Sequence, residues 1–231
     1  QVGFVKKTHT TYNSVDCMLY IENPSGASYC ANIYLENLFI NGDISGDQVT
    51  NLVAYGIYCP GSVEFIDVDN CMISAITCIS YYNPFVWSVK RTLMLPKNKG
   101  IEVVSSGTSG RIEECLVQSP RVCGYDLRGG YSSMASCACD GALAIAYSFQ
   151  WGAWEVSGLG AESTCDTVVY AYKAQVNIKD ATVFHPSNAV GVIFHADSES
   201  FLTVDGVRVA TGKDFDSLAQ LTDKAVVHLS E

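Results

Sequence analysis

Ile112-Glu-Glu-Cys115 and Met134-Ala-Ser-Cys137 are two copies of one four-residue unit that recurs with a period of about 22 residues. The unit has an apolar or small residue at each end and two mostly polar residues between them. Eight copies occur, and the intervals between their successive starts are 33, 21, 23, 22, 22, 22 and 26. A repeat this regular is typical of a solenoid, in which each residue has its neighbours one period away. The other copies are Leu35-Glu-Asn-Leu38, Val68-Asp-Asn-Cys71, Val89-Lys-Arg-Thr92, Val156-Ser-Gly-Leu159, Ile178-Lys-Asp-Ala181 and Val204-Asp-Gly-Val207.

Residues at fixed distances from each unit are mostly apolar, with the two-residue spacing of a strand that buries one face. For the unit that starts at Val68, Ile66 lies two residues before the start and Ile73 lies five residues after it. A second strand is indicated about eleven and nine residues before the unit, for example by Ile57 and Cys59. Glycines, asparagines and serines punctuate the gaps, as turns require. The polar pair inside each unit is then a tight bend between two strands.

Each rung of about 22 residues therefore holds two clear strands and room for a third, with rungs stacked at the ~4.8 Å strand spacing. No gap supplies the helix that a βαβ unit needs. We expect an all-β fold, a right-handed single-stranded parallel β-helix. Lead-in strands are expected over residues 1–30, the β-helix over 31–210, and a C-terminal cap or junction with a weak helical stretch at 216–221 over 211–231. The start at Gln1 predicts a processed piece of a longer protein.

Composition narrows the class of protein. The net charge of −10 argues against nucleic-acid binding, which needs clustered Lys and Arg. No signal peptide and no apolar run of membrane-spanning length are recognisable, so no membrane insertion is expected. The ten cysteines lack zinc-site spacing. We interpret Cys71, Cys115 and Cys137 as stacked free thiols in the core, because unpaired cysteine behaves as a small buried hydrophobe. No metal and no cofactor is predicted.

Residues 78–88 are unusually rich in aromatic side chains. Tyr81, Tyr82 and Phe85 cannot all point into a narrow core, so we expect them to form an exposed aromatic cluster. Such a cluster suits either the stacking of sugars or a subunit interface.

Four runs in the middle rungs stand out: Gly107 to Cys115, Gly124 to Asp140, Ala146-Tyr147 and Gly158 to Ser163. They resemble the β-helical segments of bacteriophage tailspikes and tail fibres. The likeness is to stalk segments of endosialidase-type spikes and of fibres with a self-cleaving C-terminal chaperone. It is strongest over residues 100–165 and looser over 8–210. The resemblance implies an extracellular homotrimer on the virion that engages bacterial surface polysaccharide; some relatives are depolymerases and others only bind or act as spacers.

Cleavage of a glycosidic bond usually needs two carboxyl groups, ~5–5.5 Å apart for retention or ~6.5–9.5 Å for inversion. Asp140 and Glu162 both fall six residues after the start of their units, so we expect them on adjacent rungs, ~5 Å apart. Two like charges so close would raise one pKa, as an acid and nucleophile pair requires. The alternative is that both cap turns by accepting hydrogen bonds from backbone amides.

Glu102 and Asp126 form a second candidate pair, on adjacent rungs but offset by two residues, ~8 Å apart. Arg128 lies next outward on the same strand and could orient a sugar or a uronate carboxylate. The alternative is a surface salt bridge between Arg128 and one of the two acids. His195 falls in an inward column, so we expect a satisfied core histidine rather than a base.

These observations favour a non-catalytic receptor-binding segment of a phage fibre, because the outward columns are mixed and small, with no convergent acidic groove. The alternative is a depolymerase, an endoglycosidase or lyase acting on capsule or O-antigen through one of the carboxylate pairs. A secreted enzyme resembling pectate lyases is disfavoured by the missing signal peptide and the missing cluster of calcium-binding acids.

Overall fold

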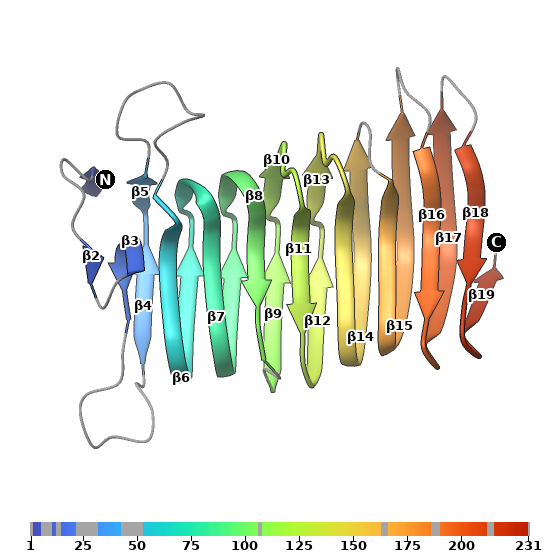
Figure 1. Ribbon diagram of the computed structural model, residues 1–231, viewed down its shortest axis with the longest axis horizontal. Coiled ribbons are helices and arrows are strands. Elements are labelled where there is room, and N and C mark those ends of the chain that lie inside the picture. Colours follow the sequence, from blue (N-terminus) through green and yellow to red (C-terminus); the bar gives the residue numbers. More distant parts are fainter. Residues whose placement is uncertain are drawn as a thin grey trace.

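The structure is a computed structural model that describes residues 2–5, 11–12, 15–21, 32–42, 53–105, 108–162, 166–185, 190–211 and 215–230. Its strands stack side by side along the long axis of the molecule, and the N- and C-terminal ends lie at opposite ends of the stack (Figure 1). No helix occurs among the described residues. The predicted all-β, parallel β-solenoid is confirmed. In the part of the chain that is described, no helix is long and apolar enough to cross a membrane.

A middle rung contains three strands, β11 (Cys123–Arg128), β12 (Tyr131–Ala135) and β13 (Ala138–Asp140). All three pair in parallel with the single long strand β14 (Ile145–Glu162) of the next rung. The third strand for which the period left room is therefore present. Partners in register lie one period apart along the chain and include Tyr125 with Tyr147, Met134 with Val156 and Cys139 with Ala161.

The same course recurs along the stack, with the strands of a rung either separate or fused across its corners. The N-terminal strands are β1 (Val2–Val5), β2 (Thr11–Tyr12), β3 (Val15–Tyr20), β4 (Ile33–Glu36) and β5 (Leu38–Asn41). Then follow β6 (Tyr55–Asp69), β7 (Met72–Lys90), β8 (Leu93–Val103), β9 (Ser109–Glu113) and β10 (Leu116–Gln118). After β14 come β15 (Thr167–His185), β16 (Val190–Asp197), β17 (Phe201–Thr211), β18 (Phe215–Leu221) and β19 (Val226–Ser230).

The predicted bend inside the four-residue unit is present in all eight copies. The third residue of each unit has a left-handed backbone conformation, which glycine and asparagine adopt most readily. The backbone N–H of this residue reaches the neighbouring rung; that of Arg91 donates to the carbonyl of Glu113 at 2.9 Å. The φ values are Asn37 56°, Asn70 50°, Arg91 45°, Glu114 52°, Ser136 51°, Gly158 63°, Asp180 58° and Gly206 72°.

The fourth residue of several units is a cysteine that points into the core. Cys71, Cys115 and Cys137 are buried, and each thiol donates to the carbonyl two residues earlier at 3.2 Å. None of the three forms a disulfide. The predicted stack of core thiols is confirmed, and these thiols satisfy carbonyl groups at the bend.

Residues 215–230 continue the coil. β18 pairs in parallel with β16, and β19 pairs in parallel with β17. The predicted helical stretch at 216–221 is wrong, because stacking against the preceding rung decides the conformation over a weak local preference. At the other end, β1 pairs with β5 and β3 with β6, so the lead-in strands also stack on the coil.

Candidate functional site

One outward row of polar and aromatic side chains runs along the first strand of the rungs; we call it the tyrosine–carboxylate row. Its neighbours along each strand, such as Ile101 and Tyr125, are fully buried in the core. Five rung steps separate Tyr58 from Tyr170, ~24 Å at the strand spacing. The row consists of Tyr20, Tyr58, Ser80, Glu102, Asp126, Ser148, Tyr170, His195 and Gln220, which pair in register from rung to rung.

The centre of the row is an ion-pair network around Lys99. Its Nζ lies 2.5 Å from Oε1 of Glu102 and 2.7 Å from Oδ2 of Asp126. The other carboxylate oxygens accept hydrogen bonds from Ser80 Oγ (3.1 Å) and Gln150 Nε2 (3.0 Å). All four carboxylate oxygens therefore have partners.

The pKa of Lys99 reflects two opposing effects. Burial alone would lower it, but the hydrogen bonds and charges of Asp126 and Glu102 raise the pKa above its ordinary value. The ammonium group is therefore held in its charged form between the two carboxylates.

The structure corrects the sequence prediction for this pair. Glu102 and Asp126 are direct partners in register rather than offset by two residues. The paired residues Glu102 and Asp126 of the first strand are 24 residues apart along the chain, whereas the paired residues Arg111 and Ser133 of the second strand are 22 apart. The first-strand interval is therefore longer by two residues. By count along the chain, the two additional residues fall between Glu102 of β8 and Arg111 of β9.

Arg128 does not bind either acid, so the predicted salt bridge is also wrong. Its Nη1 donates to the carbonyl of Val104 at 3.0 Å, and its guanidinium carbon lies 5.9 Å from the ring centroid of Trp151. Lys99, which pairs in register with Cys123, makes the ion pairs that were assigned to Arg128.

Aromatic rings lie at both ends of the tyrosine–carboxylate row. At the N-terminal end, Tyr55 stacks on Tyr58 with centroids 4.4 Å apart, and Tyr20 lies 5.8 Å from Tyr58. At the C-terminal end, Tyr170 meets His195 edge to face at 5.1 Å. The sequence prediction missed these tyrosines, although those at 58 and 170 fall on the same column as the two acids.

The C-terminal end of the row is polar as well as aromatic. The Tyr170 hydroxyl donates to Oδ2 of Asp197 at 3.2 Å, and Thr222 donates to Oδ1 of Asp197 at 2.6 Å. Burial, followed by the charge of Asp197, raises the pKa of Tyr170 to about 12. His195 lies in this outward row rather than in the core; Phe194 and Ala196 are the buried residues.

The second predicted pair is on the third strand. Asp140 and Glu162 are partners in register on adjacent rungs, so their predicted stacking is confirmed. Burial, and then the charge of Glu162, raise the pKa of Asp140 above its ordinary value. No described backbone amide donates to either carboxylate, so the turn-cap alternative finds no support in that part of the chain.

The predicted aromatic cluster is only partly exposed. Tyr82 and Phe85 are exposed, but Tyr81 is fully buried, with its ring edge to face against Trp87 at 5.9 Å. Tyr81 takes an inward position because it follows Ile79 in the alternation of the strand. It is therefore unavailable to a sugar, and the prediction of an exposed Tyr81 is wrong.

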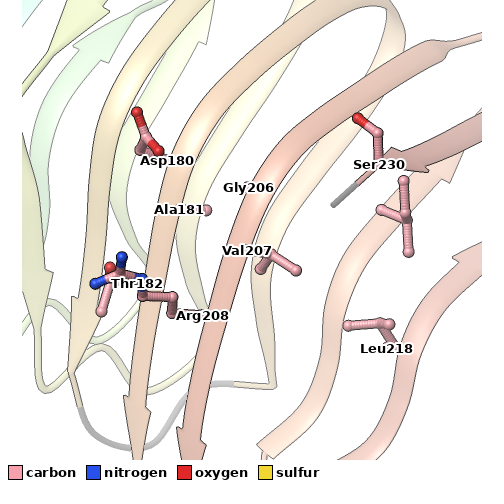
Figure 2. Close-up of a pocket in the computed structure, with 9 residues that line it drawn as sticks. Asp180, Ala181, Thr182, Gly206, Val207, Arg208, Leu218 and Ser230 are labelled. Carbon is pink, nitrogen blue, oxygen red and sulfur yellow. The ribbon is translucent and has the colours of Figure 1, made fainter.

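A hollow of about 720 Å³ lies at the C-terminal end of the stack. Figure 2 shows Val207 and Leu218 pointing into the space between neighbouring strands there. Among the described residues, β19 pairs with Phe201–Asp205 of β17, and no further strand covers 207–211 on that side. The hollow is therefore the open end of the core, not a reaction site.

No group of three or more metal-binding side chains occurs in the described ranges. Comparisons of the chain with models of protein families, with curated proteins and with solved structures find no match.

Proposed function

We propose that this chain is a segment of a bacteriophage tail fibre or tailspike, a homotrimeric β-helix on the virion that binds bacterial surface polysaccharide without cleaving it. The resemblance of the middle rungs to phage tailspikes and tail fibres suggests the location on the virion. The tyrosine–carboxylate row is the observation that supports binding. It has partly exposed aromatic rings at both ends, and the partly exposed side chains of Lys99 and Glu102 lie between them, while Ser80, Asp126 and Ser148 are buried.

The row suits a sugar chain for physical reasons. Tyrosine presents an apolar ring face and a polar hydroxyl, so it can stack on a sugar ring and remain hydrogen bonded. Ser80, Lys99 and Gln150 are held in place by the acids, and little side-chain entropy is lost when a ligand binds ordered groups. An extended polymer can therefore lie along the stack, with aromatic rings at both ends of the row and the ion-pair network between them.

The same network argues against catalysis by Glu102 and Asp126. A general acid must carry a proton, and a nucleophile needs a free carboxylate oxygen. Lys99 lies between the two acids, and all four of their carboxylate oxygens have partners. These groups bind and position rather than react.

The second candidate function is a depolymerase that uses Asp140 and Glu162. The raised pKa of Asp140 beside a second carboxylate favours it, since a general acid needs that shift. Release of reducing sugar from capsular and O-antigen polysaccharides would measure it. Release that is abolished in an Asp140→Asn/Glu162→Gln double variant would replace the binding proposal by this one.

Retention of the protein on immobilised capsular and O-antigen polysaccharides tests the binding proposal. Removal of two rings in a Tyr58→Ala/Tyr170→Ala variant should weaken retention roughly tenfold, at ~0.5–1.5 kcal/mol per ring. Phe201→Ala is the control, because Phe201 is an exposed aromatic residue of β17 that lies outside the row. Wild-type protein that binds no polysaccharide, or a double variant that binds as well as wild type, would contradict the proposal.

A further inference from the structure

Trp151 is the exposed tryptophan of the chain. Of the three tryptophans, all of which the structure describes, Trp87 and Trp154 are buried, whereas Trp151 is 43% exposed. It lies at a corner within β14, which pairs with β11 before this residue and with β12 after it. A single exposed apolar residue is common on protein surfaces, so the backbone and the contacts of Trp151 are more informative than its exposure.

The backbone at Trp151 has a conformation that disfavours a bulky side chain. Its φ is 56°, in the left-handed region, where a tryptophan is an outlier and costs conformational free energy. At the same corner of the neighbouring rungs stand Gly129, with φ 136°, and Lys173, with φ 50°. The corner therefore does not itself require an aromatic residue. Strained residues of this kind cluster at ligand sites.

A fixed cation holds the indole ring on the first-strand side of the corner. The guanidinium carbon of Arg128, on the preceding rung, lies 5.9 Å from the ring centroid of Trp151. Arg128 lies two residues after Asp126 on β11, and its Nη1 donates to the carbonyl of Val104 at 3.0 Å. The indole ring is therefore held beside the tyrosine–carboxylate row.

The place of Trp151 complements that row, whose middle positions carry no aromatic ring. Trp151 lies on the rung of Ser148, one step before Tyr170. Its neighbour Gln150 pairs in register with Tyr172, whose ring stacks with that of Tyr170 at 6.5 Å between centroids. The aromatic end of the row therefore widens toward the corner at Trp151.

We propose that Trp151 is a sugar-stacking residue of the polysaccharide site, so that the polymer crosses the corner as well as following the row. The indole offers a broad apolar face to the C–H groups of a pyranose ring, and its N–H remains free to donate at the ring edge. Because the indole is uncharged, the net charge of −10 does not oppose this contact. Arg128 holds the ring in place, so little side-chain entropy is lost on binding. This inference rests on the proposed binding function and adds to it a residue outside the row.

Two substitutions at the same position separate binding from stability. Trp151→Ala and Trp151→Gly should each weaken retention on immobilised capsular and O-antigen polysaccharides about fivefold, because one stacked ring is lost. Glycine relieves the left-handed strain, so the unfolding midpoint of Trp151→Gly should equal or exceed that of the wild type. Alanine keeps the strain, so Trp151→Ala should be the less stable of the two. Phe65→Ala is the matched control, since Phe65 is also 43% exposed but lies on the second strand of an earlier rung.

Intrinsic fluorescence gives an independent readout, because Trp151 is the indole that solvent reaches. Soluble polysaccharide should shift the emission of the wild type to shorter wavelength and reduce quenching by acrylamide. Trp151→Phe keeps the two buried indoles and a ring that can still stack. It should therefore retain most of the binding but show neither spectral change.

The outcomes distinguish this inference from the proposed function. A wild type that is retained on polysaccharide with unchanged emission and quenching would overturn the inference and leave polysaccharide binding intact. Trp151→Gly that binds as well as the wild type, or that loses stability together with binding, would do the same. A wild type that binds no polysaccharide would overturn both.

Discussion

The first-strand and second-strand faces of the same rungs differ in how their side chains are satisfied. On the first strand, Lys99, Glu102 and Asp126 saturate one another with hydrogen bonds and remain half-buried or buried. On the second strand, Tyr131 and Phe65 are exposed around a hollow that their own chain leaves empty. One repeating backbone therefore carries a preorganised polar surface and an incomplete apolar surface.

The largest expected effect tests the packing beneath the second-strand face. Gly110→Leu should destabilise the fold by about 3 kcal/mol, because the new side chain collides with Trp87 in a filled core. Denaturant unfolding measures this loss. Gly160→Ala is the control and should be nearly neutral, since its Cβ would lie 3.5 Å from that of Ala138, an ordinary contact. Equal stability of Gly110→Leu and wild type would show that the indole ring of Trp87 does not fill the space beside Gly110.

A second prediction concerns the ion-pair network on the first-strand face. Lys99→Met should cost about 2 kcal/mol at neutral pH, because two adjacent carboxylates are left without a cation. Partial exposure of the lysine keeps the loss below that of a fully buried pair. The loss should shrink in acid, where the carboxylates of the variant are protonated. A loss that persists undiminished in acid would assign it to packing rather than charge.

The wild type has its own pH dependence from the same lysine. The pKa of Lys99 is raised in the folded state, so its stabilising contribution is complete below the ordinary value of 10.5. It should be lost as pH rises through the higher folded pKa. Unfolding curves of wild type and Lys99→Met should therefore converge above that pH. Curves that stay parallel at high pH would contradict this assignment.

A third prediction tests the bends that both faces share. Glu114→Asn should stabilise the fold by about 1 kcal/mol, because asparagine tolerates the left-handed conformation better than glutamate. Glu114→Ala removes the same charge without that tolerance and should give no gain. Thermal unfolding of the two variants measures the difference, and an equal gain in both would point to charge instead.

The smallest effect concerns the carboxylate pair that lacks a cation. Asp140→Asn should stabilise the fold by a few tenths of a kcal/mol at pH 7, because solvent screens the repulsion it removes. The raised pKa means that the wild type gains stability in acid and loses it as pH rises through that pKa. The two proteins should therefore be equally stable near pH 3. A difference at pH 3 as large as that at pH 7 would contradict the like-charge explanation.

The repeating parts of the fold follow from the sequence because they depend on local patterns. The bend at Asn70 or Gly158 needs only a residue that accepts a positive φ, and the apolar spacing around it defines the strands. The pairing of Asp140 with Glu162 was predictable because no corner intervenes between the unit and these residues.

The remaining features of the site could not be predicted, because they depend on segment lengths and side-chain contacts that differ from rung to rung. The two extra residues between Glu102 and Arg111 bring Glu102 into register with Asp126, and the 22-residue period of the units gives no signal of them. The partnership of Lys99 with Asp126 spans 27 residues and follows only once the shift is known. Tyr81 and Tyr82 are the same residue type, but the alternation of side chains along β7 buries Tyr81 and exposes Tyr82.

The stacked left-handed bends make the molecule extensible in whole units. Insertion of one complete copy of the repeat would place a new bend on the same column and lengthen the coil by ~4.8 Å, with no other part of the core rebuilt. Insertion of a single residue within a strand would instead turn every following side chain of that strand to the opposite face. The chain can therefore serve as a spacer whose reach is set by copy number, while each added rung brings another outward position for recognition.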